Sequence, residues 1–109
     1  MLSRLVFALL VPSTVAFAAE PELARQSELV RLVRQDCGSC HGMTLQGGLG
    51  PALLPENIKD KPVDSMVATI YYGRPGTPMP PWKQFMSEPE AAWIVQKLTS
   101  GFPELVESN

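Results

Sequence analysis

The hydrophobic pattern of the chain predicts helices and no strands. Apolar residues recur every three or four positions over Pro21 to Gln35 and again over Ser87 to Ser100, which is the spacing of one helix face. A shorter helix is expected over Ser65 to Tyr72, capped by Asp64 and ended by Gly73. We therefore predict an all-α protein with three to four short helices. The apolar positions expected in the first and last helices are Leu23, Leu29, Val30, Leu32, Val33, Ala91, Trp93, Ile94, Val95 and Leu98.

The start and the end of the last helix are marked most clearly. Ser87-Glu88-Pro89-Glu90 is a capping box with proline in the first turn, and Gly101 is a typical stop. Between the helices, Gly42 to Val63 has four glycines and three prolines, and Arg74 to Trp82 has four prolines in nine positions. We expect both segments to be loops. Phe102 to Asn109 is expected to be a loosely held tail.

The first 18 residues have the pattern of a secretory signal rather than of a folded element. Arg4 supplies the positive charge, Leu5 to Val11 is uncharged and apolar, and Ala16-Phe17-Ala18 fits a cleavage site. We predict export to the periplasm and a domain over residues 19–109. An uncleaved anchor is the alternative. No later apolar run reaches the roughly 18 residues that span a membrane.

Composition limits what such a domain can do. The formal charge of −2, with 18% charged residues, gives no support for nucleic-acid binding. An apolar fraction of 45% is too high for a disordered chain. A chain this short forms a small core, so a disulfide, a metal or a cofactor is expected to stabilise it.

The segment Cys37-Gly38-Ser39-Cys40-His41 has the C-x-x-C-H spacing typical of haem c attachment. Two thiols one helical turn apart reach the two vinyl groups on one porphyrin edge, and the next residue coordinates iron. A structural zinc site needs four ligands, and the chain has three cysteine and histidine residues in total. A thioredoxin-like pair needs a βαβ context, and a simple disulfide leaves His41 unexplained. One covalently bound haem c is therefore predicted.

Because His41 is the only histidine, the second iron ligand must be a methionine or a rarer donor, or that position holds no ligand. Met43 is too near His41 to reach the other side of the ring, whereas Met66 and Met86 have apolar neighbours that favour packing. Met79 lies between Pro78 and Pro80, which restrict the backbone around a single sulfur ligand. We predict His41 and Met79 as the metal ligands. Filling both axial positions favours electron transfer over catalysis.

A ligating histidine usually donates its other N–H to a carbonyl or a carboxylate. The glycine-rich segment Gly47-Gly48-Leu49-Gly50-Pro51 can bring a carbonyl close to His41, and we predict that of Pro51. An ordinary surface turn is the alternative for this segment.

The order of these features resembles a monohaem class I cytochrome c over nearly all of residues 19–109. That resemblance implies a small fold around one haem, in which the first and last helices cross. Leu29, Val30 and Val33 would then face Trp93, Ile94 and Val95. It also implies haem-binding roles for Cys37, Cys40, His41, Pro51 and Met79.

A narrower resemblance comes from YYGRPGTPMPPWKQF together with the CGSCHG and GGLGPAL segments. These are similar to the NirC-type cytochrome c55X family, which is linked to cd1-type nitrite reductase. The resemblance implies electron delivery to that reductase, or a role in making its haem d1. We predict an electron carrier in denitrification that is a monomer and not an enzyme. The alternatives are a redox or maturation factor in haem d1 biosynthesis, or a detachable haem subunit of another oxidoreductase.

Overall fold

A computed structural model describes residues 3–12 and 20–104 of the chain. These residues form helices and loops, with no strand among them. Residues 3–12 have no regular secondary structure and are exposed, while the predicted cleavage site at Ala16 to Ala18 lies outside the described residues. No helix in the described part combines the length and the apolar character needed to cross a bilayer.

The first helix is longer than the sequence predicts. It begins as α1 (Leu23–Leu32), passes through one turn of π-helix, η1 (Val33–Cys37), and ends as α2 (Gly38–His41). The wider turn is closed by the Gly38 N–H, which donates to the Val33 carbonyl five residues earlier. The predicted end at Gln35 is therefore wrong, because the helix continues through the whole C-x-x-C-H segment.

The middle of the chain contains one helix that was not expected. Helix α3 (Pro55–Ile58) interrupts the predicted loop of residues 42–63, with proline at its start and Ile58 buried at its end. Helix α4 (Val63–Tyr72) begins before the expected position, because Pro62 and not Asp64 precedes its first turn. Asp64 lies inside that turn, so the prediction of an Asp64 cap is wrong, whereas the stop at Gly73 is confirmed.

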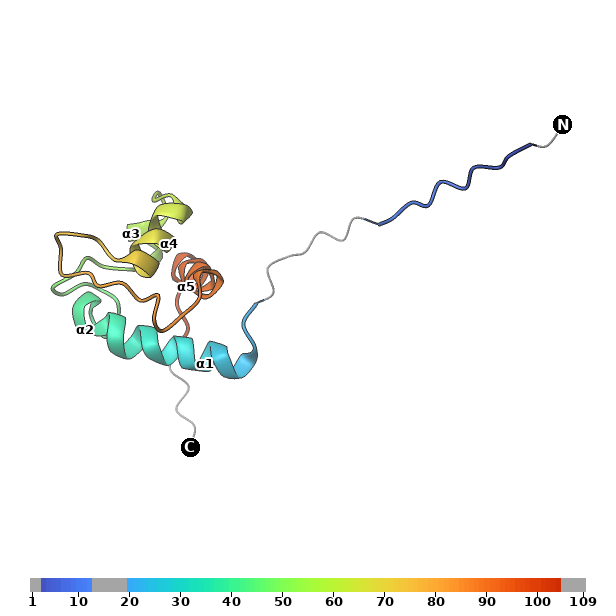
Figure 1. The fold of residues 1–109 in the computed structure, drawn as a ribbon. Coiled ribbons are helices and arrows are strands. Elements are labelled where there is room, and N and C mark those ends of the chain that lie inside the picture. Colours follow the sequence, from blue (N-terminus) through green and yellow to red (C-terminus); the bar gives the residue numbers. More distant parts are fainter. Residues whose placement is uncertain (1–2, 13–19, 105–109) are drawn as a thin grey trace.

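Helix α5 (Glu88–Ser100) has the predicted boundaries and cap. The Ser87 hydroxyl accepts from the Glu90 N–H at 3.2 Å, and the Glu90 carboxylate accepts from the Ser87 N–H at 2.8 Å. Figure 1 shows α5 nearly end-on, between α1 and the α3–α4 pair, so the first and last helices cross as expected.

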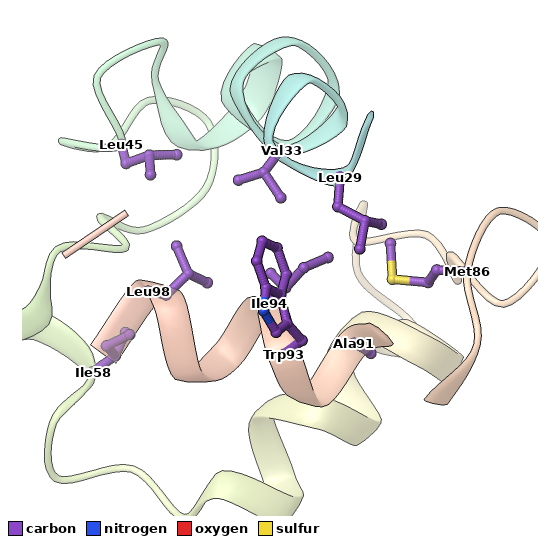
Figure 2. Packing of buried hydrophobic residues seen from close by; sticks show 9 residues of the cluster. All are labelled: Leu29, Val33, Leu45, Ile58, Met86, Ala91, Trp93, Ile94 and Leu98. Carbon is purple, nitrogen blue, oxygen red and sulfur yellow. The ribbon is translucent and has the colours of Figure 1, made fainter. Parts of the chain in front are cut away.

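The core lies at this crossing. Figure 2 shows Leu29 and Val33 pointing toward Trp93 and Ile94, and Val30 packs against the same cluster. Two predicted core positions differ. Leu23 is 81% exposed, and Val95 is buried but lies outside the cluster. The complete set of buried cluster members is Leu29, Val33, Leu45, Ile58, Met86, Ala91, Trp93, Ile94 and Leu98.

The loop after α2 is fixed to this core by one strained residue. Leu45 has a φ of 63°, a backbone conformation that residues other than glycine rarely adopt. Its side chain is nevertheless buried, with only 2% of its surface exposed. Its carbonyl also accepts from the Leu53 N–H at 2.9 Å. Burial of an apolar side chain, worth about 1.5–3 kcal/mol, offsets the backbone strain and holds the loop beside α2.

The start of the C-terminal segment is held more firmly than the sequence predicts. The Arg34 side chain, in η1, is buried and donates to the carbonyls of Phe102 and Pro103 at 2.9–3.1 Å. Its guanidinium also lies over the Phe102 ring, 5.4 Å from the centroid. Residues 102–104 are therefore anchored to the first helix, while the rest of the predicted tail, residues 105–109, lies outside the described part.

Candidate functional site

The three residues of the attachment motif lie on one helical stretch. Cys37 closes η1, while Cys40 and His41 lie in α2. Both thiols are free, with Cys37 half-buried and Cys40 exposed. Burial raises the pKa of Cys37 to about 11, and the charge of Asp36 adds to the rise. Cys37 is therefore a neutral thiol near pH 7, unlike the activated thiolate of a disulfide oxidoreductase.

The His41 ring is fixed by a carbonyl of the following loop. Its Nδ1 lies 2.7 Å from the Pro51 carbonyl oxygen. A carbonyl only accepts, so in the neutral ring Nδ1 carries the proton and Nε2 presents its lone pair. This is the tautomer that a metal-ligating histidine needs, with its orientation set by a second group.

Gly50 lets the loop approach the ring this closely. A Cβ at this position would lie 2.8 Å from both Cε1 and Nδ1 of His41, which is closer than such atoms come. The Gly50 N–H donates to the Cys40 carbonyl, and the Gly47 N–H donates to the His41 carbonyl, each at 2.8 Å. The loop thus wraps the end of α2. The sequence alone did not single out Gly50. Its position directly before Pro51 was the signal that could have indicated this role.

The Met79 segment is a second, separate loop. Its base is joined to α4, because the Trp82 N–H donates to the Ile70 carbonyl at 3.0 Å and the Lys83 N–H donates to the Tyr71 carbonyl at 3.2 Å. Met79 itself is half-buried. Within the described residues, no hydrogen bond joins this loop to the motif or to Pro51. The structure thus brings Cys37, Cys40, His41 and Pro51 together. Met79 lies in a different loop, which is hydrogen-bonded to α4.

The other methionines have different surroundings. Met86 is 5% exposed and belongs to the core cluster, and Met66 packs against that cluster from α4. Met43 is 63% exposed and follows His41 by two residues. Packing therefore accounts for Met66 and Met86, as their apolar neighbours in the sequence indicate.

The arrangement fits haem c better than a metal ion held by side chains alone. Among residues 3–12 and 20–104, no group of three histidine, cysteine or acidic side chains is placed to hold an ion. Instead there are two unpaired thiols on successive helical turns, a histidine with Nε2 available, and a glycine that keeps space beside the ring. These are the donors that a covalently bound iron porphyrin requires.

Known proteins are similar to most of this chain. The family model described as cytochrome C oxidase, cbb3-type, subunit III matches residues 24–96. Cytochrome c55X of Pseudomonas aeruginosa is 56% identical over 81 residues, which cover 74% of this chain and 68% of that protein. The solved structure of the c-type cytochrome NirC is 54% identical with a TM-score of 0.73, covering 74% of this chain and 95% of the other.

A larger enzyme contains a similar part. The structure of dihydro-heme d1 dehydrogenase NirN in complex with DHE is 34% identical, with a TM-score of 0.59. The match covers 68% of this chain but only 16% of that enzyme. Both the fold and the covalently bound haem c follow from these relationships. The chain belongs to the NirC-type cytochrome c55X family, a group of small class I c-type cytochromes.

Proposed function

We propose that this chain is a periplasmic, single-electron carrier whose haem is held by four side chains. Cys37 and Cys40 would form the thioether bonds, and His41 and Met79 would bind the iron. The observation that carries the proposal is the hydrogen bond between His41 Nδ1 and the Pro51 carbonyl, which leaves Nε2 free for iron. The rigid Met79 loop, anchored to α4, supports the choice of the second ligand.

Each residue has a defined task in this carrier. The two thioethers keep the haem on a small chain from which a loosely bound porphyrin would escape. The Pro51 carbonyl fixes the His41 ring and raises its basicity, which influences the reduction potential. When bound, the haem iron supplies reversible one-electron chemistry, and His/Met ligation raises its potential relative to His/His ligation.

Electron transfer rather than catalysis follows from the ligand set. With both His41 and Met79 bound, the iron would have no coordination position open to a substrate. The chain acts as a monomer after cleavage behind Ala18, and it forms short-lived complexes of small interface with its redox partners. Cleavage removes Arg4 and leaves a side-chain charge of −3, which favours partners with a positive rim.

The spectrum of the purified protein tests the ligand set. Ferric haem with a methionine ligand has a weak far-red sulfur-to-iron band, and the ferrous form resists carbon monoxide. Replacing Met79 with alanine should abolish the band and permit carbon monoxide binding. Met66→Ala and Met86→Ala are matched controls that should keep the band. A five-coordinate wild-type spectrum, or loss of the band in Met86→Ala instead, would contradict the proposal.

The family resemblance supports cd1-type nitrite reductase as the electron acceptor. The test is to mix the reduced cytochrome with purified reductase and nitrite and to follow reoxidation of the haem. We expect fast reoxidation at low ionic strength and slower transfer as salt screens the attraction. Absence of transfer at low salt would exclude the donor role.

The likeness to dihydro-heme d1 dehydrogenase favours a second candidate role in haem d1 biosynthesis. Oxidation of a dihydro-porphyrin to the porphyrin releases two electrons and two protons, so two molecules of oxidised cytochrome would accept the electrons in succession. Mixing the oxidised cytochrome with that enzyme and its substrate should give two reduced haems per product. Unchanged oxidised haem during turnover would exclude this role.

A further inference from the structure

The loop that carries Met79 closes on itself through its backbone. The Arg74 N–H donates to the Met79 carbonyl at 3.1 Å, and the Thr77 N–H donates to the Arg74 carbonyl at 3.1 Å. These two bonds bring the first and last residues of the turn together. The position of the Met79 side chain therefore depends on how firmly this turn is fixed.

One side chain connects both ends of the turn. The Thr77 hydroxyl donates to the Arg74 carbonyl at 2.7 Å and accepts from the Met79 N–H at 3.3 Å. A hydroxyl group does both at once because it has one proton and two lone pairs. Thr77 is thus the residue whose side chain holds the amide directly attached to the Met79 Cα.

The prolines make this hydroxyl important. Pro75, Pro78, Pro80 and Pro81 have no N–H, so four of the nine residues from Arg74 to Trp82 cannot donate a backbone hydrogen bond. Few backbone donors are left to order the turn around Met79. A side-chain hydroxyl supplies the bonds that the proline-rich backbone lacks.

Gly73 lets the backbone pack closely at the base of the turn, whereas Thr77 forms its hydrogen bonds within the turn. It has a φ of 71°, and a Cβ there would lie 2.8 Å from the Met79 carbonyl oxygen and from backbone atoms of Pro80 and Pro81. The end of α4 therefore lies directly against the backbone beyond Met79. With that base held, the Thr77 hydroxyl restricts the remaining freedom on the N-terminal side of Met79.

We propose that Thr77 is the positioning residue for Met79, holding the turn so that the sulfur stays on the haem iron. This inference rests on the proposed ligation by Met79. Removing the hydroxyl leaves the ligand in place but makes the turn looser, so Met79 gives way more readily to a competing ligand. Losing the two hydroxyl hydrogen bonds predicts a rise of about tenfold in the apparent affinity of an added ligand.

The experiment is a titration of the ferric holoprotein with imidazole, followed by loss of the far-red sulfur-to-iron band. Thr77→Val keeps the shape of the side chain and removes the hydroxyl, and Thr77→Ala is a second removal variant. Thr77→Ser restores the hydroxyl. Thr69→Val is the matched control, because Thr69 lies in α4 and its hydroxyl donates to the Ser65 carbonyl.

We expect Thr77→Val and Thr77→Ala to bind imidazole about tenfold more tightly than wild type. Thr77→Ser and Thr69→Val should stay within about twofold, because each keeps both hydroxyl bonds of the turn. Thr77 is exposed, so the variants should fold, and circular dichroism checks this.

Two results would overturn the inference while leaving Met79 as the ligand. One is an imidazole affinity in Thr77→Val equal to that of wild type. The other is a rise in imidazole affinity in Thr77→Ser as large as that in Thr77→Val, which would show that the shape of the side chain and not its hydroxyl causes the effect. Failure of the ligand assignment looks different, because Met79→Ala would then retain the far-red band that wild type shows.

Discussion

At the scale of single residues, the Arg25–Glu90 ion pair joins the first helix to the last. Arg25 donates to the Glu90 carboxylate, to Glu28 at 2.8 Å and to the Phe85 carbonyl at 2.6 Å. The bond from Arg25 is the main reason that the pKa of Glu90 lies below its usual value, and the Ser87 N–H and hydroxyl add to the effect. The Glu90 side chain is 19% exposed, so water screens this pair only partly.

This lowered pKa predicts a specific loss of stability in acid. In the unfolded chain a glutamate takes up its proton near pH 4.3, whereas Glu90 in the folded protein does so at a lower pH. Its contribution is therefore fully present above about pH 4.3 and falls as pH decreases toward the folded value. Glu90→Gln keeps an oxygen for the Ser87 N–H but cannot titrate. Its free energy of unfolding, from urea titrations between pH 7 and pH 3, should fall less steeply than that of wild type. Parallel curves would contradict this account.

At the scale of elements, α5 depends on its cap. Ser87→Ala removes the acceptor for the Glu90 N–H and should lower the free energy of unfolding by about 1 kcal/mol. Ser100→Ala is the control at the other end of the same helix, where the hydroxyl donates back to the Gln96 carbonyl at 3.0 Å. That change should alter stability by less than about 0.5 kcal/mol. Urea denaturation followed by circular dichroism compares the two variants. Equal losses in the free energy of unfolding would show that the cap stabilises the helix no more than the Ser100 hydroxyl does.

The elements that sequence predicts best are those with local signals. The capping box, the apolar spacing and Gly101 all lie within α5, so its bounds were predictable from its own residues. The continuation of the first helix into η1 and α2 was not, because a π-turn has no distinct residue pattern and Gly38 is a poor helix former. Helix α3 is a single turn, too short for a periodic pattern to develop.

In the candidate site too, contacts between residues close in the sequence were predictable, and contacts that depend on the path of the chain were not. The attachment motif is a local pattern, and the contact between His41 and Pro51 spans only ten residues of a glycine-rich loop. By contrast, the hydrogen bond from Arg34 to Phe102 connects residues 68 positions apart, and the sequence shows only an arginine between Val33 and Gln35. Thr77 was equally hidden, because its two hydrogen bonds depend on the path of the turn.

At the scale of the whole molecule, the mass of the purified protein tests both the proposed leader and the cofactor. Adding a thiol across a vinyl group loses no atoms, so the mature protein should have the mass of residues 19–109 plus one complete haem. Intact-mass spectrometry of periplasmic material measures this directly. A mass that includes residues 1–18 would support the anchor instead, and a chain without haem, from a host with working attachment machinery, would contradict the central assignment.

The buried Arg34 has a consequence for trimming of the chain by proteases. Its guanidinium donates to two carbonyls beyond Gly101, those of Phe102 and Pro103, and the Phe102 side chain packs against the core cluster. Cutting the chain after Gly101 would therefore remove the acceptors of the Arg34 guanidinium, in the turn that leads into Cys37. The contact of Phe102 and Pro103 with Arg34 thus supports the helix only three residues before the first cysteine of the attachment motif.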